Sequence, residues 1–384
     1  MNNKLEGMQG IEKFRMQLEF AHMFNVDNRA AKGRLEESVD KYHPNRIDYR
    51  VVQINQQTPT AKTIRLASVT GYLPPFVPGQ YINIILDVNG VKTSRPYSIS
   101  SPSTQTAYYE ITVREKGGGF VSDYLLNELK TGDLISSTSP DGHFYHHPIH
   151  GNDIVFIAGG SGITPFMSMV QTYYEKYDTT KNIELIYGCA NKDDIIFELE
   201  LRKLEKLYPN FKLSLVISEP DAGYNGLTGF ITADIIQKVV GNIEGKVFFL
   251  CGPEVMYNFV IGELKKIGVK DINVRREVQS APSDPTKLSG WPQGVDKNSV
   301  FKVIINNERV IEAKATEPLL NTLERYGITR EAKCRSGECS LCRTKLVEGT
   351  VYHPSTVRLR KSDRQFGYIH PCVAYPVSDI KINI

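Results

Sequence analysis

The chain has 384 residues, enough for roughly two to four domains, and its 41% hydrophobic and 23% charged content excludes a disordered or fibrous protein. Its 46 basic and 43 acidic residues leave a net charge of +3, which is too small to indicate nucleic acid or an anionic membrane as a partner. No apolar run reaches the roughly 20 residues of a membrane span, and no stretch resembles a secretory leader, so we expect a cytoplasmic location.

Residues 1–46 are predicted to form a helical extension. Apolar side chains at Ile11, Phe14 and Leu18, followed by the stretch from 20 to 24, give one apolar helix face. Such a face usually packs on a neighbouring domain, and docking of a partner or a second subunit is the alternative. The role of this extension and the oligomeric state stay open.

Residues 47–150 are predicted to form a small antiparallel β-barrel interrupted by one helix, because short β-rich runs alternate with turn residues. In "RPYSIS", at 95–100, the arginine can bind a phosphate, the tyrosine ring can lie against a flavin, and a serine hydroxyl can reach its N5 region. In "GGGFVSDYL", at 117–125, backbone N–H groups are free at the start of a helix, which is a natural phosphate site. The two motifs together predict one bound flavin.

Residues 151–279 alternate between strand and helix patterns, which predicts a parallel doubly wound sheet. In "FIAGGSGITP", at 156–165, a glycine loop follows an apolar strand and lets a diphosphate approach a helix N-terminus. In "FLCGPEVM", at 249–256, Cys251 stands at the carboxyl end of a later strand, where open α/β sheets bind ligands. Residues 280–299 are rich in Pro, Ser and Gly, and are predicted to be a linker.

Residues 300–384 are predicted to form a third domain that contains four of the six cysteines. Cys334, Cys339 and Cys342 form a C-x4-C-x2-C pattern, and Cys372 follows after 29 intervening residues, as in a plant-type 2Fe-2S cluster. A four-cysteine zinc site is the alternative, but zinc ribbons usually pair two C-x2-C hooks. Clustered ligands without a disulfide framework also indicate a reducing compartment.

With these motifs in this order, residues 48 to 384 resemble the ferredoxin–NADP reductase family, particularly the reductases of phenylacetyl-CoA epoxidase, phthalate dioxygenase and hybrid-cluster protein systems. The resemblance implies a multidomain fold with an antiparallel β-barrel flavin domain, an α/β doubly wound nicotinamide domain and an α+β ferredoxin domain of the β-grasp type. It implies that Ser98 and Cys251 lie at the reacting flavin and nicotinamide rings. The implied flavin contacts are Arg95, Pro96, Tyr97, Ser98, Val113, Gly118, Gly119, Val121 and Ser122, and the implied nicotinamide contacts are Gly159, Gly160, Ser161, Gly162, Thr164, Ser218, Cys251, Gly252 and Pro253.

NADH is predicted in preference to NADPH. NADPH-specific relatives often grip the 2′-phosphate with a Ser-Arg pair, whereas here Ser218 is followed by Glu219. A carboxylate at this place would repel a phosphate and could accept hydrogen bonds from a ribose diol. Lys192 could supply a replacement charge, which keeps NADPH as the alternative.

FAD is predicted in preference to FMN. Relatives like phthalate dioxygenase reductase use FMN, whereas most of the broader family uses FAD. The aromatic side chains of Tyr108, Tyr109 and Phe120 could receive an adenine, which favours FAD.

The three modules predict an electron relay. NADH gives up two electrons as hydride, a 2Fe-2S cluster accepts one at a time, and a flavin converts between them. The expected function is therefore an NAD(P)H-dependent reductase that delivers single electrons to an unidentified acceptor protein, with Arg335, Glu338 and Arg343 at an exposed docking face. Two alternatives are a free-standing diaphorase or flavin reductase, and a non-enzymatic redox sensor or assembly subunit.

Two further groups are set aside. His143, His146, His147 and His150 are interpreted as part of an exposed loop, because their spacing does not specify a metal geometry. Cys189 is interpreted as a small buried residue, since no base is evident beside it.

Overall fold

The structure is a computed structural model that describes residues 34–117, 119–277, 281–282, 284–355, 357 and 359–384, together with Glu12, Arg15, Met16, Glu19, Phe20 and Met23. Its contacts divide the chain into two compact units, Met1–Asn45 and Arg46–Ile384, which are described separately. Helix α2 (Arg34–Tyr42) belongs to the smaller unit. The apolar positions predicted at Ile11, Phe14 and Leu18 lie outside the described residues. Within the described part of the chain, no helix is both long and apolar enough to cross a membrane.

The larger unit begins with an antiparallel barrel of six strands in the spatial order β4-β3-β6-β1-β2-β5. A bridge between Ile99 and Ile111 joins the end of β4 to β5 and closes the sheet. Every second residue of β1, from Ile47 through Tyr49 to Val51, is buried in the barrel core, as strand geometry requires. The elements are β1 (Ile47–Thr58), β2 (Ala61–Ser68), β3 (Tyr81–Val88), β4 (Val91–Ser98), β5 (Tyr109–Arg114), α3 (Phe120–Asn127), β6 (Leu134–Ser137) and the 3-10 helix η1 (Pro148–His150).

The second domain is a parallel sheet in the order β10-β9-β8-β7-β11-β12. The strand order reverses between β7 and β11, so ligands are expected at the carboxyl ends of these two strands. The strands are β7 (Asp153–Gly159), β8 (Asn182–Cys189), β9 (Phe211–Ile217), β10 (Leu227–Thr228), β11 (Val247–Cys251) and β12 (Val274–Arg276). The helices are η2 (Gly160–Ile163), α4 (Thr164–Glu175), η3 (Lys192–Asp194), α5 (Glu198–Leu207), α6 (Ala233–Val240), α7 (Glu254–Lys266) and η4 (Asp271–Asn273).

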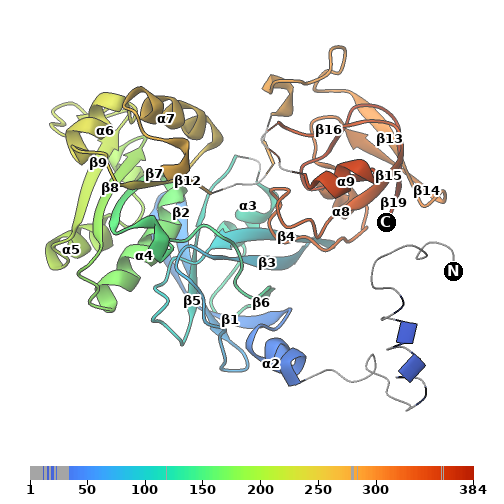
Figure 1. Ribbon diagram of the computed structural model, residues 1–384, viewed down its shortest axis with the longest axis horizontal. Helices are drawn as coiled ribbons and strands as arrows, with labels where there is room; N and C mark the ends of the chain where they lie inside the picture. Colours follow the sequence, from blue (N-terminus) through green and yellow to red (C-terminus); the bar gives the residue numbers. More distant parts are fainter. Residues whose placement is uncertain are drawn as a thin grey trace. The chain divides into compact units, whose positions relative to one another are not determined.

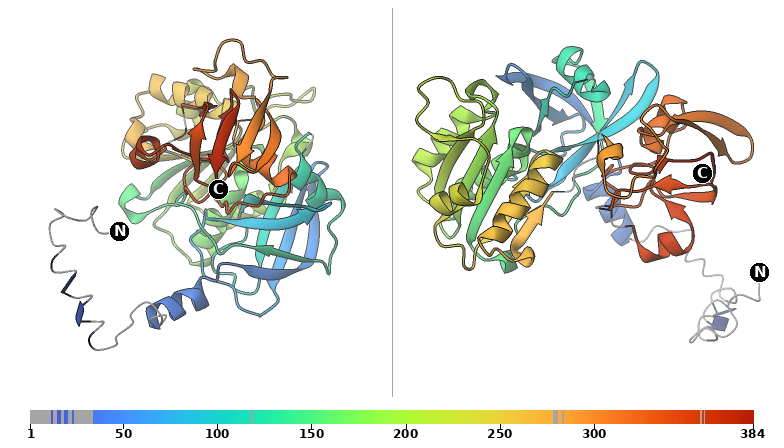
Figure 2. Two further views of the ribbon diagram at one scale, coloured as in Figure 1. Left: turned by 90° about the vertical axis from the view of Figure 1, so that its right-hand side faces the viewer. Right: turned by 90° about the horizontal axis from the view of Figure 1, so that it is seen from above.

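The third domain is a mixed sheet in the order β14-β13-β19-β15-β17, in which β13 and β19 are parallel. Figure 1 shows this domain and the parallel sheet flanking the barrel, and the view from above in Figure 2 agrees. Its elements are β13 (Val300–Ile305), β14 (Arg309–Lys314), α8 (Leu319–Arg325), β15 (Thr344–Glu348), β16 (Val351–Tyr352), α9 (Lys361–Gln365), β17 (Tyr368–Ile369), β18 (Tyr375–Pro376) and β19 (Ile380–Asn383). The three predicted fold classes are confirmed.

The stretch predicted to be a linker packs against the third domain. It contains the short helix η5 (Pro285–Lys287), and the ring of Trp291 lies edge-on to Tyr352 with centroids 5.1 Å apart. The Tyr352 hydroxyl donates to the carbonyl of Ser289 at 2.9 Å, and the Tyr375 hydroxyl donates to that of Pro282 at 2.8 Å. The described part of this stretch is therefore anchored.

Candidate active site

A cavity of about 970 Å³ is lined by residues from all three domains of the larger unit. The predicted site residues on its wall are Arg95, Pro96, Tyr97, Ser98, Gly119, Val121, Ser122, Ser161, Thr164, Cys251, Cys334, Cys339 and Cys372. The predicted residues Val113, Gly159, Gly160, Gly162, Ser218, Gly252, Pro253 and Cys342 do not line it, and Gly118 lies outside the described residues. The tertiary fold thus brings the main flavin, nicotinamide and cluster motifs to one space.

The flavin side of the cavity is formed by β4 and the start of α3. Gly119 is the N-cap of α3 and supplies no side-chain cap, so the first N–H groups of the helix can receive a phosphate. Burial and the nearby positive charge of Arg335 lower the pKa of Arg95 to about 10, so it is still a cation at neutral pH. Both elements line the cavity, where they could bind a flavin phosphate. The predicted contact Val113 has only 1% of its surface exposed and packs in the barrel core.

The glycine loop of the nicotinamide side packs directly on the end of β11. A Cβ added to Gly162 would lie 2.1 Å from the carbonyl oxygen of Cys251 and 2.7 Å from the nitrogen of Gly252. Only glycine allows this approach, which joins the two motifs predicted from the sequence. The hydroxyl of Thr164, at the start of α4, donates to the Ser161 carbonyl at 2.7 Å and closes a compact turn at the N-terminus of that helix.

Glu277 connects the two predicted catalytic residues, and the sequence reasoning missed it. Its Oε1 accepts a hydrogen bond from the Ser98 hydroxyl at 3.3 Å, and its Oε2 accepts one from the Cys251 thiol at 2.8 Å. Burial raises the pKa of Glu277, against the lowering effect of both hydrogen bonds. The available signal was its place directly after β12, at the carboxyl edge of the sheet.

The four cysteines of the third domain form two pairs of sulfurs. The sulfurs of Cys334 and Cys339 are 3.3 Å apart, and their hydrogen bond lowers the pKa of Cys334 to about 5 and raises that of Cys339. Cys342 and Cys372 share a second such bond, which lowers the pKa of Cys342 and raises that of Cys372. Among the described His, Cys, Asp and Glu side chains, no three converge on one metal position. Two pairs suit two iron ions better than a single zinc ion.

The loop around these cysteines is shaped for a cluster. Backbone N–H groups of Ser336 and Cys339 donate to the Cys334 sulfur at 3.4 and 3.3 Å. The buried Ser340 hydroxyl has no partner among the described residues and could donate to a cluster sulfur. Gly337 has φ +85°, and a Cβ there would lie 2.8 Å from Val357, so the fold requires glycine. The site residues therefore fit a 2Fe-2S cluster.

The residues that bear on nucleotide choice follow β8 and β9 at the carboxyl ends of these strands. The N–H of Ser218 donates to the Cys189 carbonyl at 3.0 Å, and that of Glu219 donates to the Ala190 carbonyl at 2.7 Å. The ammonium of Lys192 lies 5.3 Å from the ring centroid of Tyr224. The carboxylate of Glu219 is exposed, as a contact to a ribose would require.

The prediction that Tyr109 helps to form an aromatic surface for an adenine is wrong. This side chain is 1% exposed, and its hydroxyl donates to the carbonyl of Pro74 inside the barrel, because inward-facing positions of β5 fill the core. The ring of Tyr108 is covered by the guanidinium of Arg65 at 4.0 Å. Phe120 is 44% exposed and lines the cavity, so it alone of the three faces the cofactor space.

From the sequence, no function was assigned to the histidines of residues 143–150 or to Cys189. His143 and His147 are exposed at the wall of the cavity, where His150 also lies. The Nδ1 of His147 accepts a hydrogen bond from a backbone N–H at 3.3 Å. Cys189 is buried, as predicted, and burial raises its pKa to about 12, which keeps the thiol protonated.

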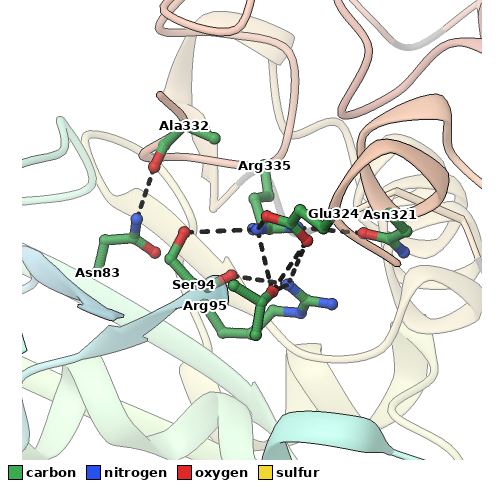
Figure 3. Close-up of polar contacts among 8 residues, drawn as sticks. Asn83, Ser94, Arg95, Asn321, Glu324, Ala332 and Arg335 are labelled. Atoms are coloured by element: carbon green, nitrogen blue, oxygen red, sulfur yellow. Dashed lines mark hydrogen bonds and ion pairs between the residues drawn. The ribbon is translucent and has the colours of Figure 1, made fainter. Parts of the chain in front are cut away.

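Three charged residues were predicted to lie on an exposed docking face. This prediction is wrong for Arg335. It is buried against β4 of the barrel, where it lies close to Glu324, Ser94 and Arg95 (Figure 3). Glu338 is exposed but lines the cavity. Arg343 remains on the surface, with 55% of its side chain exposed.

Comparison with known proteins gives the three domains names. Family models match residues 57–146 as an oxidoreductase FAD-binding domain, 156–261 as an oxidoreductase NAD-binding domain and 303–377 as a 2Fe-2S iron-sulfur cluster binding domain. The predicted cofactors FAD, NADH and a 2Fe-2S cluster are thereby confirmed.

Curated relatives match almost the whole chain. The glycine betaine monooxygenase reductase subunit of Chromohalobacter salexigens is 25% identical over 88% of this chain and 95% of its own length. The NADH oxidoreductase HCR of Escherichia coli is 28% identical over 86% of this chain and 95% of its own length. The solved structure of phthalate dioxygenase reductase has the same fold, with a TM-score of 0.66 and 20% identity over 88% of this chain and 98% of that one. The chain therefore combines an oxidoreductase FAD-binding domain, an oxidoreductase NAD-binding domain and a C-terminal 2Fe-2S domain, and its relatives are ferredoxin reductases of the phthalate dioxygenase reductase type.

Proposed function

We propose that this protein is a cytoplasmic, NADH-preferring reductase that passes single electrons to a partner protein. The proposed parts are a helical extension (1–46), a flavin barrel (47–150), a nicotinamide domain (151–279), a linker (280–299) and a ferredoxin domain (300–384). Relatives named as reductase subunits of monooxygenases favour an oxygenase component as the acceptor. Free thiolate ligands, which need reducing conditions, support the cytoplasmic location.

The observation that carries this proposal is the single cavity shared by the three domains. Cys334, Cys339 and Cys372 line it, whereas Cys342 does not. Leu341 and Arg343, on either side of Cys342, are exposed. Electrons would therefore enter the ferredoxin domain from the cavity and leave on the side of Cys342.

The residues of the chain supply binding and orientation. When bound, FAD accepts a hydride from NADH and passes electrons one at a time to the 2Fe-2S cluster. We assign Arg95 and the α3 N-terminus to the flavin phosphates, and the Gly160–Thr164 turn to the nicotinamide diphosphate. Glu277 holds the Ser98 hydroxyl and the Cys251 thiol in fixed orientations at the cavity wall. No acid or base of the protein is required for hydride transfer itself.

A rapid-mixing experiment with NADH tests the proposal. In the purified protein, NADH should bleach the flavin and then the cluster absorption within the time of one turnover. Cys334→Ala should lose cluster reduction and reduction of a protein acceptor, but it should keep NADH-dependent reduction of a small dye. Cys189→Ala, at a buried cysteine far from the ligands in the sequence, is the matched control.

The alternatives predict different results. If Cys334→Ala left reduction of the physiological acceptor intact, the protein would be a diaphorase in which the cluster is a side branch. If NADH bleached neither chromophore, a non-enzymatic sensor or assembly role would replace the proposed function.

A further inference from the structure

A buried ion pair lies where the ferredoxin domain meets the flavin barrel. The guanidinium of Arg335, directly after the cluster ligand Cys334, pairs with the carboxylate of Glu324 on α8, and their side chains are 5% and 6% exposed. Arg335 has φ +50°, a left-handed backbone conformation that few residues other than glycine adopt. Its Nη1 also donates to the side-chain oxygen of Asn321 at 3.1 Å. The pair itself belongs to one domain.

Thr93 of the barrel connects this pair to the flavin domain. Its hydroxyl donates to Oε2 of Glu324 at 2.9 Å and accepts hydrogen bonds from Arg335 at 3.3 Å and from Arg95 at 2.7 Å. Arg95 also lies 3.8 Å from the Glu324 carboxylate. Figure 3 shows Arg95 of the barrel and Glu324 and Arg335 of the ferredoxin domain pointing toward one another. One hydroxyl on β4 is therefore shared by the cluster-loop arginine and the arginine assigned to the flavin.

The residues that lead into the cluster loop also contact the barrel. The Asn83 amide donates to the carbonyl of Ala332 at 2.6 Å, and the Lys333 ammonium lies 3.3 Å from the Asp141 carboxylate. Of the four consecutive residues 332–335, all but Cys334 therefore contact the flavin domain. The cluster loop therefore packs against β3 and β4 of the barrel.

The free energy of burying the Arg335–Glu324 pair favours a role in positioning the cluster loop over a role in stability alone. Removing two charges from water costs free energy that their attraction regains only with good geometry and further hydrogen bonds, so a buried pair is weak evidence for stability alone. Here the further hydrogen bonds come from the other domain, through Thr93. The hydrogen bonds to Thr93 can form only when the cluster loop lies against β4.

We propose that Thr93 and Arg335 are positioning residues that fix the cluster loop on the flavin barrel at the distance needed for flavin-to-cluster electron transfer. The inference rests on the proposed function. In the step it serves, one electron leaves the reduced flavin and one ferric ion of the cluster becomes ferrous, while a flavin proton passes to water. No bond to the protein forms or breaks, so the protein acts through distance and orientation.

The test compares Thr93→Val with Thr93→Ser. Valine keeps the shape of the side chain but removes the shared hydroxyl, whereas serine keeps the hydroxyl, and neither change replaces a residue of the ferredoxin domain. Flavin and iron contents are measured first, and NADH reduction of the flavin and of the cluster is then followed by rapid mixing. Thr93→Val should slow cluster reduction by roughly tenfold, because it removes the hydroxyl that bonds Glu324, Arg335 and Arg95. Because Thr93 also accepts a hydrogen bond from Arg95, cluster reduction is compared with flavin reduction in the same variant, and it should be slowed several-fold more than flavin reduction.

Hydrogen exchange gives a readout that does not depend on turnover. Thr93→Val should increase amide exchange in both 91–98 and 330–343, whereas Thr93→Ser should match wild type. Arg335→Gln should show the same pattern more strongly, and Arg325→Gln, one residue after Glu324 but on an exposed pair with Glu317, should not. Unchanged cluster reduction and unchanged exchange in Thr93→Val would overturn the inference. Failure of NADH to reduce the wild-type flavin would overturn the proposed function, while the exchange result would still decide whether the loop is held.

Discussion

The hydroxyl of Ser98 donates to the carboxylate of Glu277 at 3.3 Å, although 179 positions separate the two residues in the chain. Ser98 ends β4 of the barrel, and Glu277 follows β12 of the parallel sheet. The same carboxylate accepts a hydrogen bond from the Cys251 thiol at 2.8 Å. One acidic side chain therefore sets the relative position of the groups expected at the two reacting rings.

Glu277→Gln should lower the rate of flavin reduction by NADH by roughly tenfold to a hundredfold, because the amide nitrogen cannot accept one of the two hydrogen bonds. Burial raises the pKa of Glu277 above its ordinary 4.5. As the pH falls through that raised pKa the carboxyl group becomes protonated and loses an acceptor, so the wild-type rate should fall on the acid side. The variant should lack this fall. Rapid mixing across the pH range measures both effects.

Glu244→Gln is the control for Glu277→Gln, because Glu244 is an exposed carboxylate in a turn of the same domain. It should reproduce the wild-type rate and pH profile. Equal rates for Glu277→Gln and wild type would contradict the role assigned to this carboxylate.

Gly162→Ala should destabilise the nicotinamide domain by about 1 to 3 kcal/mol, because the new Cβ would lie 2.1 Å from the Cys251 carbonyl oxygen and the backbone must shift. The KM for NADH should rise as the diphosphate turn is displaced. Chemical denaturation and steady-state kinetics measure the two effects. Gly262→Ala is the matched control, since a Cβ there meets no atom within 4 Å on helix α7 and should be neutral or stabilising.

Glu219→Arg should shift the ratio of kcat/KM for NADH over NADPH toward NADPH by at least roughly tenfold. Replacing a carboxylate by a guanidinium near a 2′-phosphate changes a repulsion into an attraction worth about 1 to 4 kcal/mol per charge at contact distance. The wild type should prefer NADH. A clear NADPH preference of the wild type would show that Lys192 supplies the compensating charge, and Glu244→Arg controls for net charge.

Arg343→Glu should change the rate at which the protein reduces cytochrome c through the surface next to Cys342. Arg343 is exposed and lies 4.0 Å from Asp363 on α9, a helix that also carries Lys361 and Arg364 at the surface. Basic cytochrome c should meet repulsion at this face, so the variant should reduce it about two- to fivefold faster at low salt and equally fast at high salt.

Lys302→Glu provides the same change in net charge on the exposed part of β13. If it accelerated cytochrome c reduction as much as Arg343→Glu, the exit side would not be specific. Reduction of a small neutral dye should be the same in both variants and in wild type.

Local sequence patterns suffice to predict the order and class of the domains and the kind of cluster. Those features depend on local patterns: the alternation of strand and helix periods, a glycine loop between a strand and a helix, and the spacing of Cys334, Cys339, Cys342 and Cys372. Such patterns act over a few residues, so they can be read without knowing how distant segments meet. The FAD-binding, NAD-binding and 2Fe-2S matches agree with that prediction.

The contacts between side chains of different domains could not be predicted from such local patterns. For Glu277 the sequence offered only its place after a strand, because its two partners are far away in the chain, and Arg335 was predicted at the surface because most arginines are exposed. Tyr109 was predicted to face a cofactor, but the register of β5 turns it into the barrel core. Whether a charge is solvated or buried depends on long-range packing, and a sequence carries no measure of the distance between segments that fold together.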